Sequence, residues 1–174
     1  MKLKKTLLVA AMIAFGGIVS TSAISATNPA TSTFQVLLKI NSACTVTAPN
    51  NLDFSNVDGN TSTALTANAA AISVTCSKNL PYSIGLKPSG GSLVGVGSMA
   101  AQTSGNTDSV AYSLFQDAAS TVWGDTASTN RKTGTVDTSG NVAKSYTVYG
   151  KVAGTALNVT PDNYKDTVTI SVYY

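Results

Sequence analysis

Apolar and polar residues alternate in the N-terminal part of the chain, starting at Phe34. The apolar positions share one parity, and they are Phe34, Val36, Leu38, Ile40, Cys44 and Val46. A period of two is typical of a β-strand with one apolar face. The run is long against an average strand of about five or six residues. We therefore expect it either to bend into two strands or to pair through its first half outside its own sheet.

The same alternation returns at the C-terminus of the chain. The apolar parity there consists of Val168, Ile170, Val172 and Tyr174. The alternation is still intact where the chain stops, so we expect no later strand to cover this one. An uncovered strand leaves an open sheet edge or groove, which normally needs covering.

Two shorter alternating runs lie in the middle of the chain. They consist of Ile72, Val74 and Cys76, followed after a short connection by Tyr82, Ile84 and Leu86. Runs this close together predict neighbouring antiparallel strands. Further strands are predicted in residues 110–117 and 144–152. The lone Trp123 is expected to pack into the core rather than to stack on a sugar.

Two other segments lack this alternation. Residues 64–71, ALTANAAA, are expected to form a loop or to lead into a strand. Residues 89–109 are rich in glycine and poor in large side chains, which predicts a surface connection. No Lys-Ser or Lys-Thr pair follows these glycines, so the segment does not match a nucleotide-binding loop.

The first residues of the chain match a secretory signal peptide. Three lysines near Met1 precede an apolar run over residues 7–19, and small residues follow it. The run is too short to span a bilayer of about 30 Å as a helix. Cleavage is expected after Ala23 or after Ala26. We therefore assign residues 1–26 to a leader and expect no lipid-spanning segment after processing.

Removal of this leader changes the charge balance. Three of the eleven Lys and Arg residues lie in it, which leaves eight against the eight acidic residues of the whole chain. A mature net charge near zero gives no indication of binding to nucleic acid or to an anionic membrane. The remaining residues, rich in Thr, Ser, Val, Ala, Gly and Asn, predict one all-β domain with a core of its own.

Cys44 and Cys76 are the only cysteines, and the chain is expected to be exported. These two conditions favour a disulfide between them over a metal site or a catalytic thiol. The loop that it closes corresponds to about 3.5 to 4 kcal/mol in the chain-entropy estimate. Because the chain has no His and no second cysteine pair, we expect no zinc site and no cofactor.

An enzymatic role is not expected. The chain has neither His nor Glu, which removes the usual general bases and acid partners. Aspartate pairs such as Asp162 and Asp166 are interpreted as turn and strand-edge residues rather than as a hydrolytic pair. We predict no catalytic residues.

Several segments in order resemble one family. They are TSTFQVLLKINSACTV at 31–46, ISVTC at 72–76, PYSIGL at 81–86, AYSLFQDAASTVWGD at 111–125, VYG at 148–150 and YKDTVTISVYY at 164–174. Together with the leader, this series resembles the spore coat protein U domain family, which includes the major pilins of archaic chaperone-usher pili. The resemblance covers essentially the whole mature chain.

The resemblance implies an incomplete immunoglobulin-like β-sandwich that lacks its final strand. A neighbouring subunit is then expected to complete it with a donor strand carrying Phe34, Val36, Leu38 and Ile40. Residues 27–40 would form this N-terminal extension and residues 41–174 the pilin domain, although alternation alone does not set their boundary. The strand with Val168, Ile170, Val172 and Tyr174 would form the groove edge and contact the chaperone.

The implied partners are identical or related pilin subunits in a head-to-tail polymer, a periplasmic chaperone and an outer-membrane usher. The implied location is a pilus at the cell surface, supporting adhesion and biofilm formation. The alternative is a secreted coat protein or a carbohydrate-binding β-sandwich module. An isolated lectin has no use for an apolar N-terminal strand, and the chain leaves no room for the receptor-binding domain of a tip adhesin.

Overall fold

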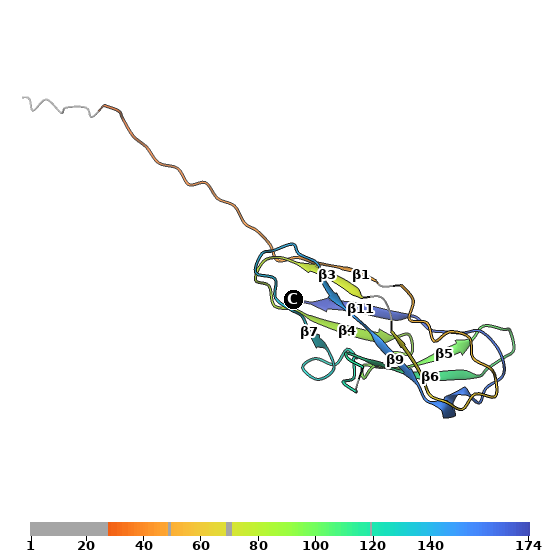
Figure 1. Ribbon diagram of the computed structural model, residues 1–174. Helices are drawn as coiled ribbons and strands as arrows, with labels where there is room; N and C mark the ends of the chain where they lie inside the picture. Colours follow the sequence, from red (N-terminus) through yellow and green to blue (C-terminus); the bar gives the residue numbers. More distant parts are fainter. Residues whose placement is uncertain (1–27, 49, 69–70, 119) are drawn as a thin grey trace, which may run out of the picture. The chain divides into compact units, whose positions relative to one another are not determined.

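The computed structural model describes residues 28–48, 50–68, 71–118 and 120–174, and the predicted leader lies outside them. The chain divides into two units, Met1–Lys39 and Ile40–Tyr174. The described residues are all-β, as predicted, apart from one 3-10 helix at Gly154–Leu157 (Figure 1). Among them, no helix has both the length and the apolar character needed to cross a membrane.

The described strands of the second unit form three antiparallel sheets. One sheet has the order β1 (Cys44–Thr47), β3 (Ile72–Cys76) and β8 (Lys144–Tyr146). Another has the order β10 (Tyr164–Lys165), β5 (Val96–Ala101), β6 (Ser109–Phe115), β9 (Tyr149–Val152) and β2 (Leu65–Asn68). The remaining sheet has the order β11 (Val168–Tyr173), β4 (Ser83–Pro88) and β7 (Lys132–Thr133).

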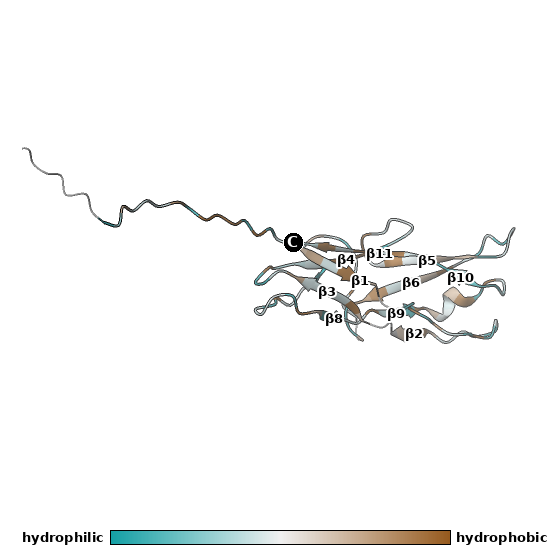
Figure 2. Ribbon diagram, turned by 90° about the horizontal axis from the view of Figure 1, so that it is seen from above, coloured by the Kyte–Doolittle hydropathy of each residue, from teal (hydrophilic) through white to brown (hydrophobic). Residues whose placement is uncertain are grey.

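The three sheets share one hydrophobic core. Alternate residues of β3, β4 and β6 are buried, so each strand turns one apolar face inward as its period of two predicts. Figure 2 shows apolar residues along these strands. Trp123 is fully buried in this core, and its Nε1 donates a hydrogen bond to the carbonyl of Ile84 at 2.9 Å. The expectation of a core tryptophan is confirmed.

The predicted pairing of the two central runs is wrong. Both runs do form strands, β3 and β4, but they belong to different sheets. β3 pairs with β1 and β8, whereas β4 pairs with β11 and β7. The short connection therefore crosses between sheets, and both strands bring their apolar faces to the same core.

Two segments without clear alternation also form strands. Residues 65–68, in the expected loop or lead-in, form β2 and pair with β9. The expected surface connection at 89–109 contains β5, which pairs with β6 and β10, so that prediction is wrong. Gly97 in β5 lies under the ring of Tyr112, where a Cβ would come within 2.2 Å of a ring carbon. β5 is rich in small residues, which removes the apolar alternation expected of a strand. The same small residues leave room for the Tyr112 ring.

Candidate functional site

Strands β1 and β11 are both unpaired on one side. β1 forms a ladder only with β3, and β11 forms one only with β4. In the described part of the chain no ladder joins β1 to β11. In Figure 1 the arrows of β3 and β11 point the same way, so β1, which is antiparallel to β3, runs opposite to β11.

A groove of about 570 Å³ opens beside these two edges. One rim consists of Ala48 and residues 51–54, which follow β1, and the other consists of residues 164–168 and Ile170, which lead into and form β11. Core side chains from other strands and their connections form the floor, namely Ile72, Leu86, Leu114 and Val148. The groove is therefore an opening into the hydrophobic core itself.

Strand register places the apolar residues of β11 on the core side. Ile170 lies opposite Leu86 and Val172 opposite Ile84, and both of these β4 residues are fully buried or nearly so. Directly opposite residues of an antiparallel pair point to the same face. Val168, Ile170 and Val172 are only partly buried, however, and no described strand pairs with the far edge of β11.

An apolar side chain on β1 is also incompletely buried. Val46 lies opposite Val74, so both side chains face the core side of the sheet. Val74 is completely buried, whereas Val46 remains 40% exposed. Both β1 and β11 thus carry apolar side chains that are less buried than their partners in the neighbouring strand.

A hydrogen-bonded aspartate holds the rim where the chain enters β11. Oδ2 of Asp166 accepts a hydrogen bond from the hydroxyl of Tyr112 at 2.6 Å, and Oδ1 accepts one from Ser89. Burial alone would raise the pKa of Asp166, but the hydrogen bonds from Ser89, Tyr112 and the amide of Thr167 together hold it below its usual value. Burial and this charged partner raise the pKa of Tyr112, which therefore stays a neutral donor.

A second aspartate anchors the other end of β11. Asp125 is buried, and its Oδ2 accepts a hydrogen bond from Tyr173 at 2.9 Å while its Oδ1 pairs with Nε of Arg131 at 2.8 Å. The Arg131 guanidinium also lies 3.4 Å from the centre of the Tyr173 ring. These contacts fix the end of β11 although the strand has a neighbour on one side only.

Tyr174 follows the end of β11 and is 60% exposed. It was grouped in the sequence with Val168, Ile170 and Val172, and of this group only Val168 and Ile170 line the groove.

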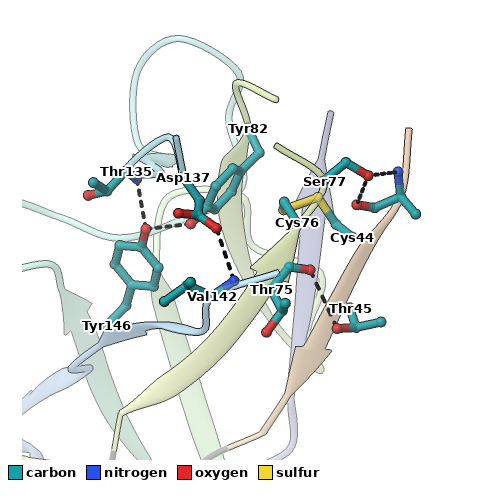
Figure 3. Close-up of a disulfide and its surroundings, with 11 residues drawn as sticks. Cys44, Thr45, Thr75, Cys76, Ser77, Tyr82, Thr135, Asp137, Val142 and Tyr146 are labelled. Carbon is teal, nitrogen blue, oxygen red and sulfur yellow. Dashed lines mark hydrogen bonds between the residues drawn. A yellow bond between two sulfur atoms is a disulfide. The ribbon is translucent and has the colours of Figure 1, made fainter. Parts of the chain in front are cut away.

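The predicted disulfide is present. Cys44 and Cys76 are bonded with an S–S distance of 2.03 Å, and they lie directly opposite each other on β1 and β3 (Figure 3). Their Cα atoms are 4.1 Å apart, as suits an antiparallel pair whose backbone groups point away from each other. The bond fixes β1, which leads into one rim of the groove at Ala48, to the central strand of its sheet.

The apolar residues of the N-terminal extension are exposed. The exposed fractions are 88% for Phe34, 86% for Val36, 86% for Leu38 and 83% for Ile40. No strand is assigned over residues 28–43, and of the long predicted strand only Cys44–Thr47 forms a ladder within this chain.

Sequence reasoning missed the polar contacts that hold the groove. Asp166 was interpreted as a strand-edge residue, and neither Asp125 nor Tyr112 was singled out. Alternation identifies apolar positions, but it carries no signal for a tyrosine and an aspartate that meet from distant parts of the chain. Trp123, the one residue considered for sugar binding, is buried and unavailable for stacking.

Comparison with known proteins places the chain in a family. Residues 30–171 match the Spore Coat Protein U domain. The chain belongs to the Spore Coat Protein U domain family. No curated protein sequence matches it at a significant level.

A solved structure has a similar fold. It is the crystal structure of the CsuC–CsuE chaperone–tip adhesion subunit pre-assembly complex from archaic chaperone-usher Csu pili of Acinetobacter baumannii. The likeness has a TM-score of 0.51 at 17% sequence identity and covers 78% of this chain and 40% of the matched chain. This chain therefore covers only 40% of the length of the chain that it resembles.

Proposed function

We propose that this protein is a structural subunit of a surface pilus, built by insertion of one subunit's N-terminal extension into the groove of the next. One observation carries the proposal: the same chain has a largely apolar groove beside the unpaired edge of β11 and an exposed apolar segment at residues 34–40. The segment has the alternation of a strand, and the groove lacks a strand. The extension of residues 27–40 is the donor, and residues 41–174 form the domain that receives it.

The free energy gained by inserting the donor strand is large enough for a stable fibre. Burying the four apolar side chains of the donor contributes roughly 6 to 12 kcal/mol, at about 1.5 to 3 kcal/mol each, before ordering costs. Backbone hydrogen bonds to the unpaired edge of β11 would add to this and slow dissociation. Because the donor and the groove are different surfaces, the contact is head-to-tail and does not close, so it extends into a filament.

The assembly partners follow from the same groove. An open apolar groove is a liability for a free subunit, so we propose that a periplasmic chaperone covers it after export and that an outer-membrane usher receives the subunit. Family membership and the fold shared with a subunit of a chaperone complex support this pathway. The fibre would serve adhesion and biofilm formation at the cell surface, and this role requires no catalytic residue and no cofactor.

A joined copy of the donor tests the proposal. Deleting residues 27–39 leaves the compact unit Ile40–Tyr174, which should still form a complex with the chaperone but should form no fibres. Joining a copy of residues 27–40 after Tyr174 through a flexible linker should then give a soluble monomer that needs no chaperone. Its groove is filled within one chain at high effective concentration, so it should resist heat better than the open subunit.

Matched substitutions in the joined copy give the control. Leu38→Asp places a charge in the groove and should remove the gain in thermal stability. Gln35→Asp introduces the same side chain at the opposite parity, which faces solvent, and should keep most of the gain. The proposal fails if the deletion prevents folding even with the chaperone, or if the joined copy changes nothing.

A further inference from the structure

The N-terminal extension is followed in the chain by the short edge strand β1. β1 forms a ladder of four residue pairs with β3, and it pairs with no other described strand. Residues 45–47, three of the four residues of β1, are exposed, so burial adds little to the attachment of this strand. A pull on the extension would therefore reach a weakly attached strand first.

One rim of the groove comes next along the chain. Ala48 and residues 51–54 line the groove. Leu52 and Phe54 pack over Gly150 of β9, where an added Cβ would lie 2.6 Å from Leu52 and 2.8 Å from Phe54. If a pull on the extension broke the β1 ladder, the force would pass along the chain to this rim. Displacing the rim would weaken the hold of the groove on any strand inside it.

The disulfide lies ahead of both the ladder and the rim. Cys44 is the first residue of β1, and it is bonded to Cys76, the last residue of β3, which lies directly opposite (Figure 3). Just before it, Ala43 accepts a hydrogen bond from the amide of Ser77 at 2.9 Å. A force that enters at Ala43 thus meets a covalent link to β3 before it reaches the rest of β1.

β3 is held more firmly than β1. It is the central strand of its sheet, with ladders to β1 on one side and β8 on the other. Ile72 and Val74 are completely buried, and Cys76 is nearly so. Displacing β3 would break two ladders and expose core side chains to water, whereas displacing β1 would break one ladder and expose little.

We propose that the Cys44–Cys76 bond transmits the tension of a fibre from the extension to β3 and so protects the groove rim from that tension. This role rests on the proposed function, because it takes the extension to be held by a neighbouring subunit. It gives the disulfide a mechanical task in addition to its contribution to folding stability. The bond should therefore matter most when force enters through the extension.

Single-molecule force spectroscopy tests this direction of pull. The sample is the monomer with a copy of residues 27–40 joined after Tyr174, and it keeps its own extension. One handle precedes residue 27 and the other follows the joined copy, so the force enters through the extension and through the filled groove, as it would in a fibre.

The protein with the bond is compared with the same protein reduced after folding and with the double variant Cys44→Ser, Cys76→Ser. Without the bond we expect a lower rupture force and an early step of about 70 Å. This is the length of the chain from Cys44 to the start of β2 at Leu65, at about 3.4 Å per residue. With the bond we expect no such step. An unchanged rupture force without an early step would overturn the proposal.

A second direction of pull is the matched control. A click-reactive residue in place of Val94, which is 53% exposed, takes the handle that preceded residue 27. The force then enters just before β5 and not through β1, so removing the bond should change the rupture force little. An equal loss of rupture force in both directions would show that the bond stabilises the domain only in a general way, and the proposal would be wrong.

The thermal stability of the same monomer separates this proposal from the proposed function. A gain in heat resistance over the open subunit shows that the joined copy fills the groove. If that gain is present and the bond has no directional effect, only the mechanical role is refuted. If the joined copy gives no gain, the proposed function fails, and the mechanical role fails with it.

Discussion

Tyr173 and Tyr174 are adjacent residues that differ in their hydrogen bonds, and they provide a matched test of one contact. Tyr173 donates to buried Asp125, whereas Tyr174 is largely exposed. Tyr173→Phe would leave a carboxylate oxygen without its donor, and we expect it to lower the free energy of unfolding by about 1 to 3 kcal/mol. Tyr174→Phe should change it little. Urea unfolding of the joined-copy monomer measures both, and equal effects would contradict the anchoring role of Asp125.

Asp166 predicts an acid dependence of stability. Its pKa is lowered in the folded protein, so its contribution is fully present above the unfolded pKa of about 3.9 and is lost as pH falls through the folded value. Tyr112→Phe removes one of the hydrogen bonds that lower this pKa and should reduce the loss of stability below pH 4 or so. Unfolding curves of both proteins from neutral to acidic pH test this. An unchanged acid dependence would show that other carboxylates dominate.

The roles of single residues were predictable from the sequence where the residue type alone indicates burial or bonding. An even pair of cysteines in an exported chain indicated the Cys44–Cys76 bond, and the size and apolar character of Trp123 indicated the core. Asp125 and Asp166 carry no such property, because their roles depend on partners brought together by the fold. Their identity follows from the structure and not from their neighbours in sequence.

Charged substitutions on the two faces of β11 should have different effects on the stability of the subunit. Val168→Asp or Ile170→Asp would place an unpaired charge on the groove side of the strand, and we expect little stable subunit to accumulate in the periplasm. Thr169→Asp introduces the same charge on the exposed face of the same strand and should accumulate normally. Immunoblots of periplasmic extracts compare the three. Equal accumulation would show that β11 does not present an apolar face to a partner.

The alternation of apolar and polar residues identified the strands that have one strongly apolar face. It did not identify β5, and it did not show which strands pair. β3, β4, β6 and β11 were predicted because their buried positions are large and apolar. β5 was missed because glycine and small residues satisfy its packing under Tyr112. The pairing of β3 with β4 was wrong because sequence proximity favours a hairpin, while two strands can also serve one core from different sheets.

At the scale of the whole molecule, the all-β class and an uncovered C-terminal strand were predicted from the pattern alone. The second rim of the groove was not, because residues 51–54 have no periodic signal and are placed by the fold. The surplus apolar run at residues 34–40 was visible in the sequence. Our proposal that it fills a neighbour's groove rests on the exposed side chains together with the open groove.

We propose that residues 34–40 of one subunit occupy the groove of another. A photo-reactive benzophenone side chain in place of Leu38, in fibres grown from a mixture of isotope-labelled and unlabelled subunits, tests it most directly. We predict crosslinks between labelled and unlabelled chains, located by mass spectrometry at groove-lining segments such as those containing Leu52 and Ile170. Crosslinks confined within single chains, or located away from the groove, would contradict the account.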